Sequence, residues 1–144
     1  MDAALKSAVV PKLRELGFKG SYPHFYRDRN GHVDLLSFQF SSWGGRLVSE
    51  IAFAVPDRSN LIALSRHTAP ARLRVTDTGR RLRLSSDGRS DPWFIYDAAM
   101  PGELCQSPTA IADRLVALVV TEGEPWWSDK RAGPADFNLQ PVRS

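Results

Sequence analysis

Residues 24–55 read HFYRDRNGHVDLLSFQFSSWGGRLVSEIAFAV, and this stretch decides the fold. Its Asn30-Gly31 dipeptide favours a two-residue type I′ hairpin, because both central positions of that turn need a positive φ. After this turn, apolar side chains alternate through two runs, 33–40 and 47–55, which the sequence SSWGGR separates. Successive side chains of a strand point to opposite faces, so the alternation predicts an antiparallel meander with one buried face. Asp34 shares the apolar face, whereas Glu50 points to the other one.

An amphipathic helix is expected before the meander, over residues 2–16, where apolar residues recur every three or four positions: Leu5, Val9, Leu13 and Leu16. Pro11 predicts a kink or a new helical start within this segment. Gly17 stands where a left-handed C-terminal cap belongs, and Phe18 follows as the apolar residue that packs back on the last turn.

The chain after the meander predicts further strands and a closing helix. Residues 71–75 and 80–84 read ARLRV and RRLRL and flank a turn, and residues 92–96 form another short strand. A short helix is expected within 56–70. Ser107 and Pro108 open the closing helix, which stops near Gly123 and has an apolar stripe of Ile111, Leu115, Leu118 and Val119.

Together these elements predict an α+β fold, with an antiparallel sheet of five or six strands and N-terminal and C-terminal helices packed on one face. We expect a single domain over residues 1–128. Residues 129–144 contain two prolines and little periodicity, so they are expected to form a tail that is docked on the domain or partly disordered.

The composition is that of a globular domain. The 144 residues are 42% hydrophobic and 24% charged, which is ordinary for one domain with a core of its own. No apolar run approaches the roughly 20 residues of a membrane helix. The N-terminus has no apolar stretch typical of a signal peptide, and a single cysteine fits a reducing compartment. These features predict a cytoplasmic protein that does not enter the membrane.

Several short motifs, taken in order, resemble an uncharacterised bacterial family, the domain of unknown function family numbered 4304. The motifs are a Gly-Phe-Lys turn, a Phe-x-Arg strand, a Gln-x-Ser strand end, a tryptophan-bearing strand and a final Glu-Pro-Trp. Here they are Gly17, Phe18 and Lys19; Phe25 and Arg27; Gln39 and Ser41; Trp93; and Glu124, Pro125 and Trp126. The resemblance spans residues 5–128 and implies an α+β fold, but it carries no catalytic residue or activity.

Sites for chemistry are poorly represented. The three histidines, His24, His32 and His67, are dispersed and Cys105 is the single cysteine, so no metal site is expected. Cys105 precedes the closing helix, yet no base is placed beside it, so we expect an incidental cysteine. Asp34 and Glu50 are expected to be solvated or paired with arginines. No nucleophile elbow and no phosphate-binding glycine motif occurs, so no cofactor is expected.

A basic ribbon is the sharpest feature. Seven arginines and two acidic residues lie between Arg66 and Arg89, a local charge of +5 within a chain of net charge +3. A hairpin over this segment would pair Arg72 with Arg83 and Arg74 with Arg81, with either a two-residue or a four-residue loop. One face would be apolar, and the other would hold four arginines in like-charged pairs, an arrangement that costs stability unless an anionic group compensates the charge. The compensating group could be internal, from nearby aspartates, or belong to an external partner.

The sequence therefore favours a non-enzymatic binding module of the immunity or regulatory type that recognises an acidic protein or another anionic partner. The expected contacts are Arg72, Arg74, Arg81 and Arg83, with Arg27 and Trp43 as further candidates. A nucleic-acid-binding domain that uses the same arginines, with tryptophans stacking on bases, is the alternative. An enzyme with an unrecognised site is third. A homodimer is compatible with exposed sheet edges.

Overall fold

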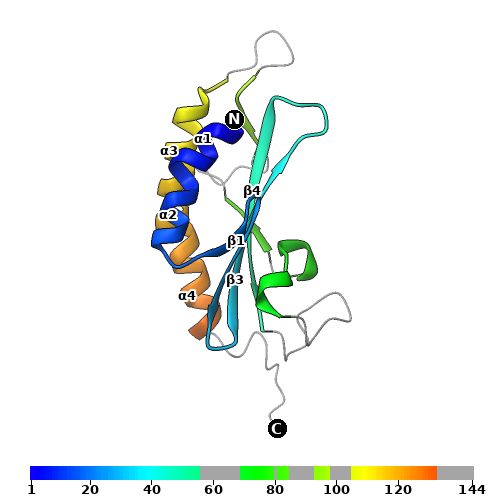
Figure 1. Cartoon of the computed structure of the whole chain (residues 1–144), viewed down its shortest axis with the longest axis vertical. Coiled ribbons are helices and arrows are strands. Elements are labelled where there is room, and N and C mark those ends of the chain that lie inside the picture. Colours follow the sequence, from blue (N-terminus) through cyan, green and yellow to red (C-terminus); the bar gives the residue numbers. More distant parts are fainter. Residues whose placement is uncertain (56–68, 80, 85–92, 98–104, 133–144) are drawn as a thin grey trace.

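An antiparallel sheet with helices on one face makes up the molecule, as the computed structural model shows (Figure 1). The structure describes residues 1–55, 69–79, 81–84, 93–97 and 105–132. Within these residues the sheet has six strands. Five follow the order β1-β2-β3-β4-β5, and β6 pairs with the start of β4, at Arg46 and Leu47. The predicted α+β fold, with five or six strands and two terminal helical segments, is confirmed. The short helix expected within 56–70 falls almost wholly outside the described residues.

The first hairpin is built as expected. Strands β2 (His24–Arg29) and β3 (His32–Phe40) pair directly around the turn, so that Arg29 lies opposite His32. Asn30 and Gly31 have φ values of 57° and 89°, the positive values that a type I′ turn requires. The short strand β1 (Lys19–Ser21) pairs with β2 and forms one edge of the sheet.

The second hairpin joins β3 to β4 (Arg46–Ala54) and places the SSWGGR segment at its tip. Gly45 has φ 78°, and its carbonyl accepts hydrogen bonds from the backbone N–H groups of Tyr96 and Asp97, just after β6 (Phe94–Ile95). A Cβ atom at Gly45 would collide with the Asp97 carbonyl oxygen. Glycine is required here because both the backbone angle and the close approach exclude a side chain.

The N-terminal helical segment runs through α1 (Asp2–Ala4), a π-helical turn η1 (Leu5–Val9) and α2 (Val10–Glu15). It ends in the expected cap. Gly17 has φ 99°, its N–H bonds to the Arg14 carbonyl, and the N–H of Phe18 reaches back to Leu13. These two bonds define a Schellman motif.

The C-terminal helical segment begins as predicted but ends later. The Ser107 hydroxyl accepts a hydrogen bond from the N–H of Ala110 at the start of α3 (Pro108–Leu118). The helix then continues through a π-helical turn, η4 (Val119–Gly123), into α4 (Glu124–Ala132). The predicted stop near Gly123 is therefore wrong, and residues 129–132 belong to α4 rather than to a tail. Residues 133–144 lie outside the described part of the chain.

Both helical segments continue past a proline in the same way. Pro11 and Pro125 each stand two positions after a five-residue π-helical turn. A proline ring clashes with the carbonyl four residues earlier, here that of Ser7 or Thr121, and both of these carbonyls lie within the wider π turns. The expected disturbance at Pro11 is thus taken up by a change of helical pitch ahead of the proline.

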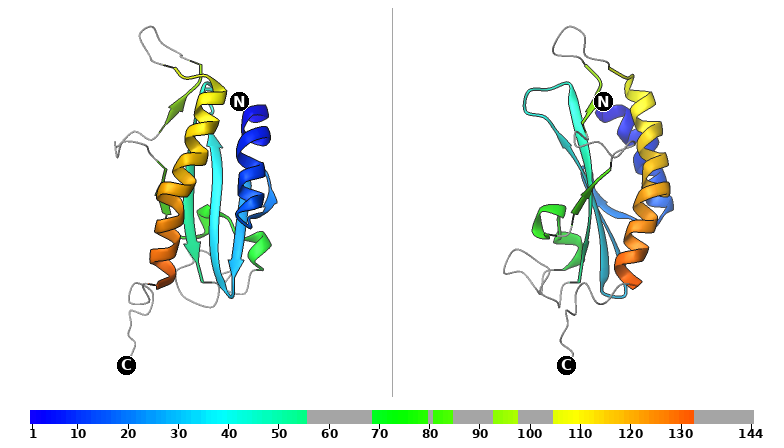
Figure 2. Two further views of the ribbon diagram at one scale, coloured as in Figure 1. Left: turned by 90° about the vertical axis from the view of Figure 1, so that its left-hand side faces the viewer. Right: turned by 180° about the vertical axis from the view of Figure 1, so that it is seen from behind.

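The sheet is buried on both faces, although the alternation predicted one. The helical segments cover one face, and Figure 2 shows them on the opposite side of the sheet from the turns after β4. On that second face a smaller cluster forms from Val33, Leu35, Ala52, Ala54, Leu73 and Val75. Leu73 directly follows the short 3-10 turn η2 (Pro70–Arg72), Val75 begins a second one, η3 (Val75–Asp77), and both side chains cover this cluster.

The predicted hairpin of the basic ribbon is wrong. Residues 70–77 form the two 3-10 turns, and β5 (Arg81–Arg83) pairs with β4 instead, with Arg83 opposite Glu50 and Arg81 opposite Ala52. The physical reason is electrostatic. The expected register would have opposed arginines to arginines, whereas β4 offers the carboxylate of Glu50 to both strand arginines.

Candidate functional site

The four arginines of the ribbon divide into two pairs. Arg81 and Arg83 flank Glu50, with an Nη1–Oε1 distance of 3.7 Å and an Nε–Oε2 distance of 3.1 Å. Arg72 ends η2 and Arg74 directly precedes η3; both are exposed, and within the described ranges no carboxylate forms an ion pair with either side chain. The sequence left open whether an internal carboxylate pairs with these arginines. Glu50 is such a carboxylate for Arg81 and Arg83.

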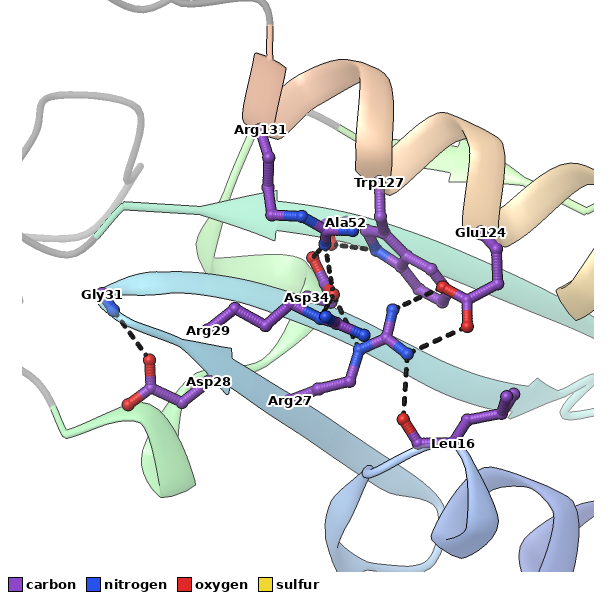
Figure 3. A network of polar contacts seen from close by, with 10 residues as sticks. All are labelled: Leu16, Arg27, Asp28, Arg29, Gly31, Asp34, Ala52, Glu124, Trp127 and Arg131. Carbon is purple, nitrogen blue, oxygen red and sulfur yellow. Dashed lines mark hydrogen bonds and ion pairs between the residues drawn. The ribbon is translucent and has the colours of Figure 1, made fainter.

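Arg27 is buried in an ionic network and does not line an open surface (Figure 3). Its side chain faces the helical layer. Nε donates to Asp34 at 2.8 Å, Nη1 donates to the Leu16 carbonyl at 3.0 Å, and Nη2 donates to Glu124 at 2.6 Å. Its guanidinium also lies 4.4 Å from the centre of the Phe18 ring. The prediction that Arg27 contacts a partner is not supported by this position.

Asp34 is the fully buried acid at the centre of the network. Besides Arg27, it receives two hydrogen bonds from Nη1 of Arg131, at 2.8 and 2.7 Å. Burial raises the pKa of the Asp34 carboxyl, and the two arginines oppose that shift. The hydrogen bonds from Arg27 lower the pKa of Glu124.

The network ties distant parts of the chain together. It joins the end of the first helical segment, the β2–β3 hairpin and α4 through side chains that mostly satisfy one another. A buried polar cluster whose members pair internally is a structural element, because no charge is left for a ligand.

Two features of the sequence could have revealed this network. Arg27 alternates with Phe25 on the face that buries apolar residues, and Asp34 stands on the same face of the next strand. The type I′ register of the hairpin then places the two opposite each other. The contact of Arg131 with Asp34 could not be predicted in this way, because Arg131 lies in a segment expected to be a tail.

The tryptophans have different environments. Trp127 is fully buried, and its indole N–H donates to the Ala52 carbonyl at 2.9 Å. Trp43 is 92% exposed at the tip of the β3–β4 hairpin. That tip lies at the opposite end of β4 from the 3-10 turns that carry Arg72 and Arg74 (Figure 1). The structure therefore does not bring Trp43 and these arginines into one site.

A cavity of about 310 Å³ opens on the sheet face opposite the helices, and we call it the sheet-face cavity. Strands β1 and β2 form one wall and the η2–η3 segment forms the other. Its lining residues are Gly20, Ser21, His24, Phe25, Tyr26, Ala71, Leu73 and Arg74. Of the predicted binding residues, Arg74 lines this cavity, and nothing in the sequence pattern groups it with His24.

His24 is the second basic group of the sheet-face cavity. Burial, together with the charge of Arg74, lowers the pKa of His24 from its ordinary value, which favours the neutral imidazole. Its Nδ1 atom is buried and has no hydrogen-bond partner in the described part of the chain. Ser21 stands directly opposite His24 across the β1–β2 pair, and neighbours in this position share a face of the sheet. Since Nδ1 has no partner, it does not activate the Ser21 hydroxyl.

Other kinds of site find little support in the described ranges. Cys105 is exposed at the approach to α3. Over those ranges, no group of three or more metal-binding side chains comes together. None of the helices seen there is long and apolar enough to cross a membrane.

Comparison with known proteins identifies the family. No curated protein and no solved structure matches this chain. A family model does match, over residues 9–129, which include every described helix and strand except the first turns of the N-terminal helix and the end of α4. The chain is thus a member of the family described as domain of unknown function (DUF4304).

Proposed function

We propose that this domain is a non-enzymatic binding module that recognises an anionic partner through Arg72 and Arg74. The observation that carries the proposal is the contrast between the two arginine pairs. Glu50 forms ion pairs with both Arg81 and Arg83, whereas the side chains of Arg72 and Arg74 are exposed and form no ion pair among the described residues. Guanidinium groups bind carboxylates and phosphates through paired hydrogen bonds, so exposed arginines of this kind suit an anionic partner.

The favoured partner is an acidic protein, as for an immunity or regulatory factor. The nucleic-acid alternative combines the same arginines with tryptophans that stack on bases, and Trp43 is the exposed one of the four tryptophans. Six residue steps of β4 separate Leu47 from Phe53, which corresponds to about 20 Å, so a single short contact does not span Trp43 and the 3-10 turns. We place the module in the cytoplasm, a reducing compartment that suits the exposed thiol of Cys105.

A charge-reversal experiment tests the proposal. Fluorescently labelled polyglutamate and a single-stranded oligonucleotide of equal length would be titrated with the protein at low salt. The R72E/R74E variant should lose at least about tenfold in affinity for polyglutamate, which is about 1.4 kcal/mol. The matched control is K6E/K12E, which makes the same change in net charge on the helical layer and should bind within about twofold of the wild type.

Two outcomes would contradict the proposal. Equal affinity of R72E/R74E and the wild type would show that these arginines do not form the site. Tight binding of the oligonucleotide with no binding of polyglutamate would favour the nucleic-acid function instead. In that case the affinity should fall steeply with added salt, because phosphate contacts release counterions.

A further inference from the structure

We infer that the sheet-face cavity is a binding site for one oxyanion group, a phosphate or a carboxylate carried by a small molecule, with Arg74, His24 and Ser21 as its binding residues. This inference rests on the proposed function, since Arg74 belongs to both. A volume of about 310 Å³ lies at the lower end of the range for small-molecule sites, roughly 300–1,000 Å³.

The charge of the lining selects an anion. None of the eight lining residues is an aspartate or a glutamate, and one of them is an arginine. A cation or a metal ion would meet Arg74 without a compensating carboxylate. An oxyanion would instead supply the ion pair that the Arg74 guanidinium lacks among the described residues, in a partly enclosed space where charge-assisted hydrogen bonds are strong.

The backbone holds Arg74 in place before any ligand binds. The residues on either side of it, Leu73 and Val75, are 3% and 2% exposed and pack on the second face of the sheet. The Arg74 N–H donates to the Asp77 carboxylate at 2.9 Å, which fixes the start of the η3 turn. A site whose backbone is already ordered loses less conformational entropy on binding.

The opposite wall offers neutral donors. A buried N–H group without a partner is rarer than a buried acceptor without one. We therefore assign the unpaired Nδ1 of His24 as the unprotonated nitrogen of the ring. The proton then lies on Nε2, which makes that nitrogen the donor of the neutral ring. The Ser21 hydroxyl, directly across the strand pair, is a second donor on the same wall.

The remaining lining residues are mostly apolar and leave room for more than the oxyanion itself. Ala71 and Leu73 contribute apolar atoms, and Tyr26 contributes an aromatic ring. The lining as a whole is more polar than apolar, so the contacts to the oxyanion are expected to dominate binding and the apolar atoms to add to it. We therefore expect a ligand that joins one oxyanion to a small aromatic or aliphatic group.

The experiment uses the full chain and four probes: inorganic phosphate, phenyl phosphate, benzoate and the neutral benzyl alcohol. Binding is followed by ¹H–¹³C NMR of the His24 ring and by calorimetry. Phenyl phosphate or benzoate should bind and shift the His24 resonances, and benzyl alcohol should not. Whichever of the two binds more tightly identifies the oxyanion as phosphate or carboxylate.

Three variants locate the bound anion. R74Q should weaken binding by at least about tenfold, whereas R81Q, the same charge change at an arginine paired with Glu50, should change it by less than about twofold. A71F fills the cavity without changing charge and should also weaken binding by at least about tenfold. Ala71 is exposed, so the fold tolerates a larger side chain there; S21F, at an exposed position of the edge strand, repeats the test from the opposite wall.

The outcomes separate this inference from the proposed function. If A71F and S21F bind the anion as well as the wild type while R74Q does not, the arginines bind outside the cavity: the proposed function stands and the cavity site is refuted. If polyglutamate binds but none of the small anions shifts the His24 resonances, the inference is refuted in the same way. If no anionic probe of either experiment binds, both are refuted.

Discussion

Replacing Arg27 with methionine tests whether the buried ionic network is structural. Methionine keeps an unbranched aliphatic chain against Phe18 and Trp127 and removes only the guanidinium. The variant loses hydrogen bonds to Asp34, to Glu124 and to the carbonyl of Leu16. If Arg27 served a partner instead, its removal would leave the free energy of unfolding almost unchanged.

The expected cost follows from what the substitution leaves behind. Removing one member of a buried ion pair typically costs about 3–5 kcal/mol, because the remaining charge stays buried. Asp34 keeps its two hydrogen bonds from Arg131, and Glu124 is partly exposed, so the value should lie near the lower end, about 3 kcal/mol. With a urea m-value of about 2 kcal/mol/M, the unfolding midpoint should fall by about 1.5 M.

Urea unfolding followed by far-UV circular dichroism measures the effect, with Arg29→Met as the matched control. Arg29 also approaches Asp34, at 3.6 Å, but its side chain is 47% exposed. Solvent screens the long contact of this half-exposed arginine, and Asp34 keeps its bonds from Arg27 and Arg131, so the control should shift the midpoint much less. Equal midpoints for the two variants would refute the claim that Arg27 is the central cation of a buried network.

Three further predictions concern single contacts. Gly45→Ala should lower the free energy of unfolding by at least about 2 kcal/mol in thermal melts, because Gly45 has φ 78° and a Cβ would strike the Asp97 carbonyl; an unchanged melt would contradict that geometry. Trp127→Phe should cost about 1–3 kcal/mol in urea unfolding, since the buried Ala52 carbonyl loses its indole donor, and a neutral result would show that water replaces it. Because burial lowers the pKa of His24, the unfolded chain binds its proton first as pH falls below 6.5, so stability should decline there. Thermal melts of His24→Gln across this pH range should show a smaller decline, and identical profiles would refute the shift.

Local features of the sequence correctly predicted the turns and helix ends that depend on a few neighbouring residues. The turn at Asn30 and Gly31, the cap at Gly17 and the helix start at Ser107 were all expected and are all present. Each depends on backbone angles or hydrogen bonds that span six residues or fewer, so the residue types carry the information.

The basic ribbon failed because strand pairing is not local. The alternation in RRLRL is compatible with any neighbouring strand, and a hairpin with 71–75 was the nearest choice in sequence. Glu50, more than thirty residues earlier, decides the pairing instead, since it is the carboxylate that β5 meets on β4. Leu73 and Val75 were expected to be buried on the apolar face of that hairpin. They are buried, but against the second face of the sheet.

The sequence by itself determined an α+β fold, the strand order of the central meander, the caps of the helices and the presence of a basic segment. Only the tertiary structure decided which of these arginines pair with a carboxylate. Arg27 is enclosed by the helical layer, Arg81 and Arg83 meet Glu50, and Arg74 lines a cavity beside His24. The physical reason is that a charge acts through its surroundings: residue type fixes the guanidinium, but burial and the position of the nearest carboxylate depend on chain segments that meet only when the sheet forms.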